Sequence, residues 1–266
     1  MSVTQTADQL FEELKQTKRQ VVLDGKTYYR VEGDLLLSER RLLEYAVYRA
    51  NELADERPED EKQRLVAIVD DDNRIVRWAK GLILTYSVSK AGFTDAQYQT
   101  VVRHMRAATA AWEAVCGVNF AHLAAFDDGS QPHTPGPLFI VRGVDTGGEV
   151  IAAAFFPNDP PDERRIIIDP VFFAPELEFN PVGVLRHELG HVLGFRHEHI
   201  RPDAPPICPS EPLGHTINLT LYDPQSVMHY FCGDVGSKEL ILTDLDRQAA
   251  RALYGPPDHE VTYVTP

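Results

Sequence analysis

Residues 184–199 read VLRHELGHVLGFRHEH. This stretch contains H-E-x-x-H followed by G-x-x-H. On a helix, residues four apart lie one turn apart on the same face, so the imidazoles of His187 and His191 converge. Gly194 accepts a positive φ and can end the helix, so that the chain turns and His197 approaches the same point from below. The stretch therefore predicts a helix, a turn and three histidines around one centre.

Three imidazole nitrogens are a ligand set of catalytic Zn²⁺ sites, because they leave the fourth position open. Glu188 is too displaced to chelate easily, but it lies close enough to take a proton from metal-activated water. H-E-x-x-H alone arises by chance in roughly a few per cent of chains of this length, and requiring Gly194 and His197 lowers this to the order of one in ten thousand. We therefore expect one zinc ion per chain, bound by His187, His191 and His197.

The residues after the third histidine narrow the interpretation. Residues 194–203 read GFRHEHIRPD, which resembles the pattern G-F-x-H-E-x-x-R-x-D of the astacin family of zinc endopeptidases, in the metzincin clan. Residues 226–230 read SVMHY and match the S-x-M-H-Y turn of that family. The resemblance covers about residues 73–266, strongly in these two motifs and loosely between them.

The resemblance implies an α+β catalytic domain over residues 73–266, split by a cleft. Its upper subdomain, 73–194, would hold a twisted mixed sheet and two helices, one of them the active-site helix, and its lower subdomain, 195–266, would be mostly loops. It also implies an enzyme that hydrolyses internal peptide bonds of proteins or peptides. Substrate would bind extended along a sheet edge such as Val150 to Phe156.

Particular residues acquire roles through the same resemblance. Glu188 would be the general base, and Tyr230 a weak ligand that swings away to stabilise the oxyanion. Met228 would form an apolar floor beneath the zinc without binding it. Glu198 would help to anchor the new N-terminus of the mature enzyme.

The first 72 residues are interpreted as a pro-segment. Residues 31–35 read VEGDL, which resembles the F-x-G-D-I element of astacin pro-segments with Val for Phe and Leu for Ile. In that family the aspartate carboxylate takes the zinc position that water needs, so Asp34 is the candidate switch of a latent zymogen. An activating protease would cut in the acidic run 54–62 or near 70–73. The alternative is a plain Gly-Asp turn between two strands.

Hydrophobic periodicity and capping signals predict the other elements. Helices are expected at 9–19, around Leu42 to Leu53, from Thr94 to about Cys116, and at 243–254; short strands are expected within 21–31 and at 81–88, 138–141, 150–156 and 165–168.

Composition limits the partners. The chain has 266 residues with 26 Lys and Arg against 40 Asp and Glu, a formal net charge of −14. Such a charge repels phosphate backbones and acidic membranes, so no nucleic-acid or membrane partner is expected. No apolar run reaches the roughly 18 to 20 residues of a membrane span. The first residues show no signal-peptide pattern, although the family resemblance favours secretion.

Three cysteines allow one disulfide. Cys208 and Cys232 are the candidate pair, the alternative being two free thiols, and Cys116 is expected to be a buried apolar side chain. The usual astacin cysteine near the C-terminus is absent from residues 253–256. This departure indicates a divergent, bacterial branch and leaves the substrate pocket open, because the acidic preference common in the family needs a basic residue such as Arg186, Arg196 or Lys238.

A second reading of the site is a catalytically silent protein that keeps zinc for stability and binds a partner on the same scaffold. Intact Glu188 argues against it, since a binding module has no need of a general base. The other histidines fit no second ligand spacing and are expected to lie in the core or at the surface. The sequon that begins at Asn218 has meaning only if the source glycosylates secreted proteins.

Overall fold

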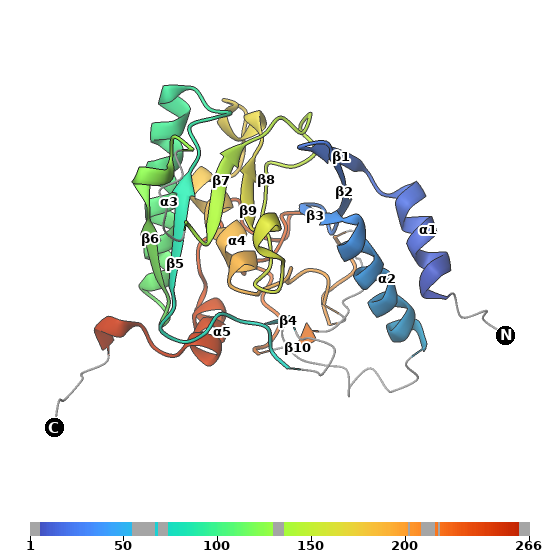
Figure 1. Ribbon diagram of the computed structural model, residues 1–266. Coiled ribbons are helices and arrows are strands. Elements are labelled where there is room, and N and C mark those ends of the chain that lie inside the picture. Colours follow the sequence, from blue (N-terminus) through green and yellow to red (C-terminus); the bar gives the residue numbers. More distant parts are fainter. Residues whose placement is uncertain are drawn as a thin grey trace.

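The computed structural model describes residues 6–54, 67–68, 74–129, 136–201, 203–208, 216–217 and 219–260. It is a mixed α+β fold in which a five-stranded sheet and helices α3, α4 and α5 lie together, with an N-terminal segment of two helices and three strands beside them (Figure 1). The α+β class expected from the sequence is therefore observed.

The five-stranded sheet has the order β6-β5-β7-β9-β8 and is mixed. Its strands are β5 (Ile83–Val88), β6 (Asn119–His122), β7 (Phe139–Gly143), β8 (Ala152–Ala153) and β9 (Arg165–Ile168). All neighbours are parallel except β8, which runs antiparallel to β9 and forms one edge. The edge strand expected over 150–156 is thus at the edge, but only two of its residues pair.

Helix α3 (Asp95–Glu113) begins at a capping box in which the Thr94 side chain accepts from the backbone N–H of Gln97. Its apolar stripe, which includes Met105 and Trp112, is buried in the main core as the periodicity predicts. This stripe packs against helix α4 (Pro181–Val192), which carries the H-E-x-x-H motif. Helix α5 (Asp244–Tyr254) adds Ala250 and Leu253 to the same core.

Helix α4 is held along its length by three side-chain donors. At its middle the indole of Trp112 donates to the carbonyl oxygen of Arg186 at 3.0 Å. At its C-terminal end the indole of Trp78 donates to Val192 O at 2.7 Å, and the phenol of Tyr254 donates to Leu193 O at 2.6 Å. Because these bonds tie the middle and the end of α4 to separate parts of the fold, the histidines on α4 have a fixed orientation.

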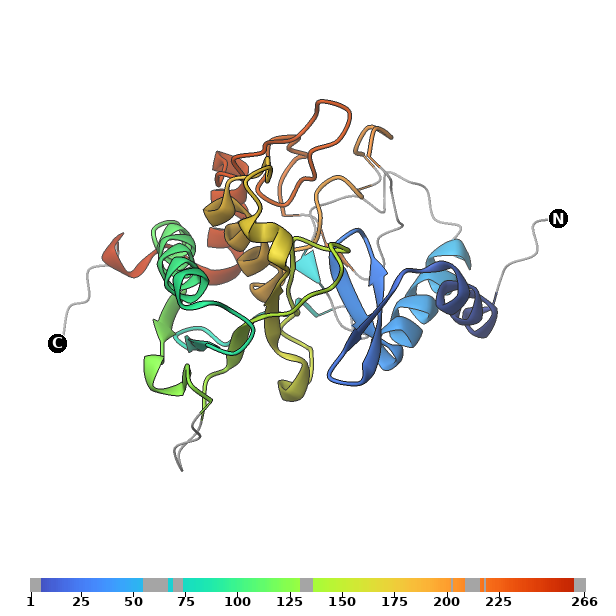
Figure 2. The ribbon, with the colours of Figure 1, turned by 90° about the horizontal axis from the view of Figure 1, so that it is seen from above.

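The N-terminal segment, residues 6–54, forms a small unit of its own. It comprises α1 (Ala7–Thr17), β1 (Gln20–Leu23), β2 (Lys26–Val31), β3 (Leu35–Ser38) and α2 (Glu39–Ala54), with the strands in an antiparallel sheet. Leu10, Leu14 and Leu42 bury an apolar cluster between the two helices and this sheet. Figure 2 shows the segment, in blue, against one side of the rest of the chain.

The N-terminal segment covers the edge of the five-stranded sheet. Val21, Leu23 and Tyr28 pack in one buried cluster with Ala153 of β8 and Ile167 of β9. The Arg30 side chain also donates to the carbonyl oxygen of Glu149, just before β8. In the full chain the N-terminal segment therefore packs against the β8 side of the sheet, and binding of a substrate along this edge stays a prediction for the protein without that segment.

The described residues between 195 and 260 lie mostly in loops, with α5 and the short strand β10 (Thr216–Ile217), which pairs with β4 (Ala67–Ile68). A disulfide joins Cys208 to Cys232, and Cys116 is a buried free thiol. Short 3₁₀ turns lie at η2 (Ala124–Phe126), η3 (Pro161–Glu163), η4 (Pro170–Phe173) and η5 (Asp258–Glu260).

Several expectations lie outside the described residues: most of the acidic run 54–62, the second acidic group 70–73, and Asn218 of the sequon. None of the described helices combines the length and the apolar composition that crossing a bilayer requires.

The loop that carries Met228 depends on one carboxylate of α5. Asp246 accepts from the Ser226 hydroxyl at 2.6 Å and from the backbone N–H groups of Val227 and Thr243 at 2.9 Å each. Asp246→Ala leaves these donors without their acceptor, so it should lower the free energy of unfolding by about 2–4 kcal/mol, measured by urea denaturation. Asp244→Ala, at the exposed first residue of α5, is the matched control and should change the free energy of unfolding by less than about 0.5 kcal/mol. Equal losses in the two variants would contradict this account of the loop.

Candidate metal centre

Helix α4 and the turn after it bring the three motif histidines together. His187 and His191 lie one turn apart on α4, and His191 and His197 are fully buried. Gly194 ends the helix with a φ of 94°, and a Cβ at this position would come 2.7 Å from the carbonyl oxygen of Val76. A larger residue would therefore meet both backbone strain and a steric clash, and only glycine allows the turn that returns His197 to the helix.

The three Nε2 atoms face one another. His197 Nε2 is 3.3 Å from His187 Nε2 and 3.2 Å from His191 Nε2. Four ligands placed tetrahedrally at the usual zinc distances of about 2.0–2.1 Å are separated from one another by about 3.3 Å. The spacing of the nitrogens is therefore that of ligands around one small cation.

The other ring nitrogen of each histidine has an acceptor. His187 Nδ1 is 2.7 Å from Val227 O, and His191 Nδ1 is 2.8 Å from Phe195 O. Since a carbonyl oxygen only accepts, these contacts place the protons on Nδ1 and leave the Nε2 lone pairs directed at the common centre. Adjacent lone pairs repel one another unless a cation lies between them.

Asp34 supplies a fourth ligand atom from the N-terminal segment. Its carboxylate oxygens lie 3.2 Å from His187 Nε2, 3.8 Å from His191 Nε2 and 3.0 Å from His197 Nε2. Burial alone would raise the pKa of Asp34, but His197 and His187 outweigh it and hold that pKa well below its usual range. The carboxyl group is therefore an anion at neutral pH.

These four residues fit a zinc ion. They are the one group among the described residues whose His, Cys, Asp or Glu ligand atoms come close enough together for a metal, all within 4.8 Å of one another. Three neutral imidazoles and one carboxylate form a donor set that Zn²⁺ accepts readily, and their buried surroundings exclude competing water.

Glu188 Oε2 and the phenol oxygen of Tyr230 are among the buried oxygens beside the histidines that have no hydrogen-bond partner in the described part of the chain. Burial, and then the charge of Asp34, raise the pKa of Glu188 well above its usual range and do the same to the pKa of Tyr230. Unpaired buried polar groups are costly and are found where a substrate or reaction needs them. Their position makes both residues candidates for contact with a reacting group.

The Tyr230 ring is held among histidines. It stacks on His199 with ring centroids 4.4 Å apart, and its centroid is 4.5 Å from that of His197. His199 and His229 are both buried, so these two histidines belong to the core around the site, as expected. The Tyr222 hydroxyl lies 2.8 Å from His229 Nε2, and the ring centroids of Tyr222 and His229 are 5.7 Å apart. These contacts fix the ring while leaving its phenol oxygen at the centre.

Glu32 is a residue at the site that the sequence analysis did not single out. Its side chain is fully buried, forms an ion pair with Arg196, and places Oε2 3.3 Å from His197 Nδ1. The N-terminal segment therefore supplies both a carboxylate to the metal position and the acceptor for the third histidine. In the motif F-x-G-D-I this position accepts any residue, and its partners lie more than 160 positions away, so no local pattern indicates the role.

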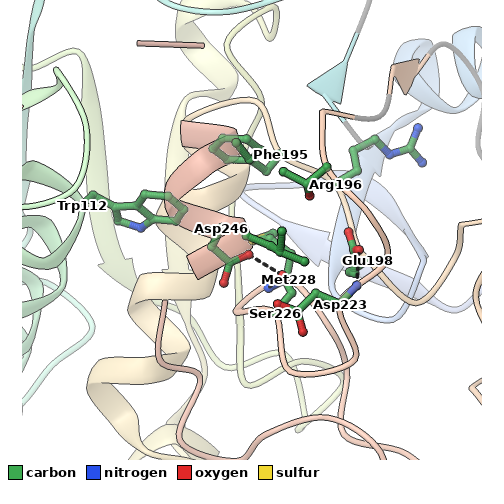
Figure 3. Close-up of a pocket in the computed structure, with 11 residues that line it drawn as sticks. Trp112, Phe195, Arg196, Glu198, Asp223, Ser226, Met228 and Asp246 are labelled. Carbon is green, nitrogen blue, oxygen red and sulfur yellow. Dashed lines mark hydrogen bonds between the residues drawn. The ribbon is translucent and has the colours of Figure 1, made fainter. Parts of the chain in front are cut away.

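Met228 and Glu198 lie on the far side of the histidines. Met228 is buried, and its sulfur occupies the space that a side chain at Gly190 would need, so it packs directly beneath α4. Glu198 accepts from Arg201 Nη1 and from the backbone N–H of Asp223, both at 2.9 Å. Figure 3 shows both residues beside a small cavity that Trp112 also lines. Burial raises the pKa of Glu198 to about 7.

Zinc binding is directly measurable on the full chain. After removal of metal by a chelator, zinc should return at one ion per chain and raise the thermal midpoint, because binding at about 1,000 times the Kd stabilises the folded state by about 4 kcal/mol. His191→Ala should abolish this shift. His104→Ala changes a half-buried histidine outside the cluster and should retain it. A zinc shift of equal size in the His191 variant would mean that the ion binds elsewhere.

Comparison with solved structures finds similar chains of low identity. One is myroilysin, with a TM-score of 0.48 and 18% identity over 71% of this chain and 98% of that chain. Another is high choriolytic enzyme 1, a hatching enzyme zinc-protease from Oryzias latipes (Medaka fish), with a TM-score of 0.47 and 17% identity over 72% and 99%. No family model and no curated protein matches the sequence. Similarity at this level carries no information on activity, which depends on the residues of the site. The chain resembles the astacin family in its two motifs, and the described residues of both motifs meet at one centre.

Proposed function

We propose that this chain is a zinc-dependent endopeptidase, made as a latent precursor. The observation that carries the proposal is the convergence of His187, His191 and His197 on one centre, with a buried and unpaired oxygen of Glu188 beside them. Four protein ligands close a structural zinc site, whereas a catalytic site keeps one position open. Here three candidate ligands belong to the main part of the chain and the fourth, Asp34, belongs to the N-terminal segment. Withdrawal of Asp34 would open the fourth position.

A zinc ion bound there supplies a Lewis acid that polarises a peptide carbonyl and makes water a better nucleophile. The carboxylate of Glu188 takes the proton from the attacking water and passes it to the leaving amine. The phenol of Tyr230 donates a hydrogen bond to the oxygen that becomes negative during attack. Helix α4 holds Glu188 next to the ligand His187, so the proton acceptor and the metal position keep a fixed separation.

Latency follows from three consecutive residues, Glu32, Gly33 and Asp34. Asp34 takes the position that the nucleophile needs, and Glu32 is held by Arg196 and His197. Between them Gly33 has a φ of 91°, and a Cβ on it would come 2.6 Å from the Tyr230 phenol oxygen. Only glycine lets the backbone approach Tyr230 so closely. The same segment covers the β8 edge, so substrate and nucleophile are excluded together.

Activation then requires a cut between the N-terminal segment and the rest of the chain. We assign residues 1–72 as the pro-segment and residues 73–266 as the catalytic domain. Release of the segment uncovers β8 for an extended substrate. It also leaves a new N-terminus, whose ammonium group we place in the cavity beside Glu198. That placement is supported by the buried carboxylate at the cavity wall.

The central experiment uses a quenched peptide library with the full chain before and after limited trypsin treatment. The segment 55–66 contains Lys62 and Arg64, after which trypsin can cut. Peptide hydrolysis should appear after the cut, vanish with a zinc chelator, and fall at least about 100-fold in Glu188→Gln, because loss of a general base typically costs 10²- to 10⁴-fold. Glu176→Gln, at an exposed position ahead of α4, should retain activity.

Two results would reject the proposal. Full activity in Glu188→Gln would remove the assigned base. Absence of hydrolysis from a cut protein that binds one zinc per chain would favour the catalytically silent binding protein instead.

The latency device predicts leakage before any cut. Asp34→Ala frees the fourth position and Glu32→Gln weakens the ion pair with Arg196, so each uncut variant should hydrolyse the library about tenfold or more faster than the uncut parent, since about 1.4 kcal/mol lost from closure gives a factor of ten. Gly33→Ala should leak likewise. Asp8→Ala, an exposed acidic position in α1, is the control and should stay latent. Parent-like latency in both Asp34→Ala and Glu32→Gln would contradict the device.

A further inference from the structure

A cavity of about 270 Å³ opens directly beside the candidate catalytic residues. His187, Glu188 and Tyr230 form one wall, and Gly33 and Asp34 of the N-terminal segment form another. The cavity is thus continuous with the position from which Asp34 would withdraw. Its volume lies just below the roughly 300–1,000 Å³ of sites for small-molecule ligands, which suits one large side chain rather than a whole ligand.

The deeper lining of this cavity is apolar. Phe179 precedes α4 and Val184 lies on it. Phe231 and Leu240 come from the loop between the Met228 turn and α5. The backbone from Val150 to Ala152, at the β8 edge, forms the remaining side. A peptide extended along that edge would direct alternate side chains toward the cavity.

No cation lines the cavity among the described residues, although the family resemblance leads one to expect a basic residue. Arg186 donates to the carbonyl oxygen of Leu240, and Arg196 pairs with Glu32 on the other side of the histidines. Lys238 Nζ forms an ion pair with Glu178 Oε2 at 2.9 Å and lies 4.6 Å from the centroid of the Phe231 ring. None of the three is positioned to receive a carboxylate inside the cavity.

Apart from Glu188, the acidic residue Glu149 would remain at the cavity after activation. Glu149 lines the cavity, and its carboxylate lies 3.5 Å from Arg30 of the N-terminal segment. Release of the segment removes that arginine and leaves a carboxylate at the entrance. A substrate Asp or Glu entering the cavity would lose its hydration without a partner and would meet the like charge of Glu149.

We infer that this cavity is a specificity pocket that accepts a large apolar side chain, of the class of Leu, Met or Phe, next to the cleaved bond and rejects Asp and Glu there. The inference rests on the proposed peptidase function and names its substrate class. Phe179, Phe231 and Leu240 are the residues that determine the preference.

The test uses the trypsin-treated full chain and quenched peptides that vary in the two residues flanking a central bond, with mass spectrometry to locate each cut. On one side of the cut, Leu, Met and Phe should exceed Asp and Glu by on the order of 100-fold in kcat/KM. Cleavage that favours Asp or Glu at that side, or that shows no preference on either side, would overturn the inference while leaving the peptidase function intact.

Variants assign the preference to the cavity. Phe179 is half-buried, so Phe179→Lys should fold, and it should shift the Leu-to-Glu ratio by about tenfold or more toward Glu; Phe231→Lys provides a second, independent position. Ile241→Lys adds the same charge at a position that is 58% exposed beside Leu240 and should leave the ratio unchanged. An unchanged ratio in both cavity variants would overturn the inference.

Binding separates this inference from the proposed function. Cut Glu188→Gln protein should bind a fluorescent peptide with central Leu at least tenfold more tightly than the same peptide with Glu, whether or not the parent hydrolyses either. Equal binding of the two peptides would overturn the pocket assignment, and absence of hydrolysis with a retained preference for Leu would reject only the peptidase.

Discussion

The structure depends on the mutual repulsion of three imidazole lone pairs that the fold forces together. Backbone carbonyls fix the protons of His187 and His191 on Nδ1, so the Nε2 lone pairs of both rings face His197 Nε2, at 3.3 and 3.2 Å. Such an arrangement is favourable only around a cation. The bonds that anchor α4, the turn at Gly194 and the Asp246 network beneath Met228 all serve to hold these rings against one another. The contacts of the core therefore also fix the geometry of the candidate metal site.

The N-terminal segment meets that centre with complementary charge. Glu32 and Asp34 bring two carboxylates to a buried cluster of histidines and Arg196, and burial is tolerated because each charge has a partner. The apolar cluster around Leu10 and Leu42 also includes Phe156 of the rest of the chain, so apolar contacts as well as charge hold the segment in place. Its contacts lie on the β8 side of the sheet and at the histidine centre. Under the proposed activation, one release would change the ligand set, the cover of β8 and the charge beside the cavity together.

The motif H-E-x-x-H with its following G-x-x-H could be interpreted from sequence because every interaction in it is local. A helix fixes the spacing of His187 and His191, and a glycine fixes the return of the chain to His197. Capping boxes and apolar periodicity likewise indicated α3 and α5. The edge strand at 150–156 was predicted too long, because a continuous apolar run indicates burial without saying whether the burial comes from strand pairing or from a covering segment.

The helix of the H-E-x-x-H motif, the turn after it and the convergence of its histidines could be predicted from the amino-acid sequence, since each depends on residues within about one helical turn. The fold class followed from the resemblance of two motifs to the astacin family, and the role of Glu188 as general base stays a proposal. Tertiary structure alone decided what those local elements meet. It placed Glu32 against Arg196 and His197, buried β8 under the N-terminal segment, and lined the cavity with Phe179, Phe231 and Leu240 instead of a cation. These are contacts between positions far apart in the chain, and no local pattern encodes which side chains a folded chain brings together across such distances.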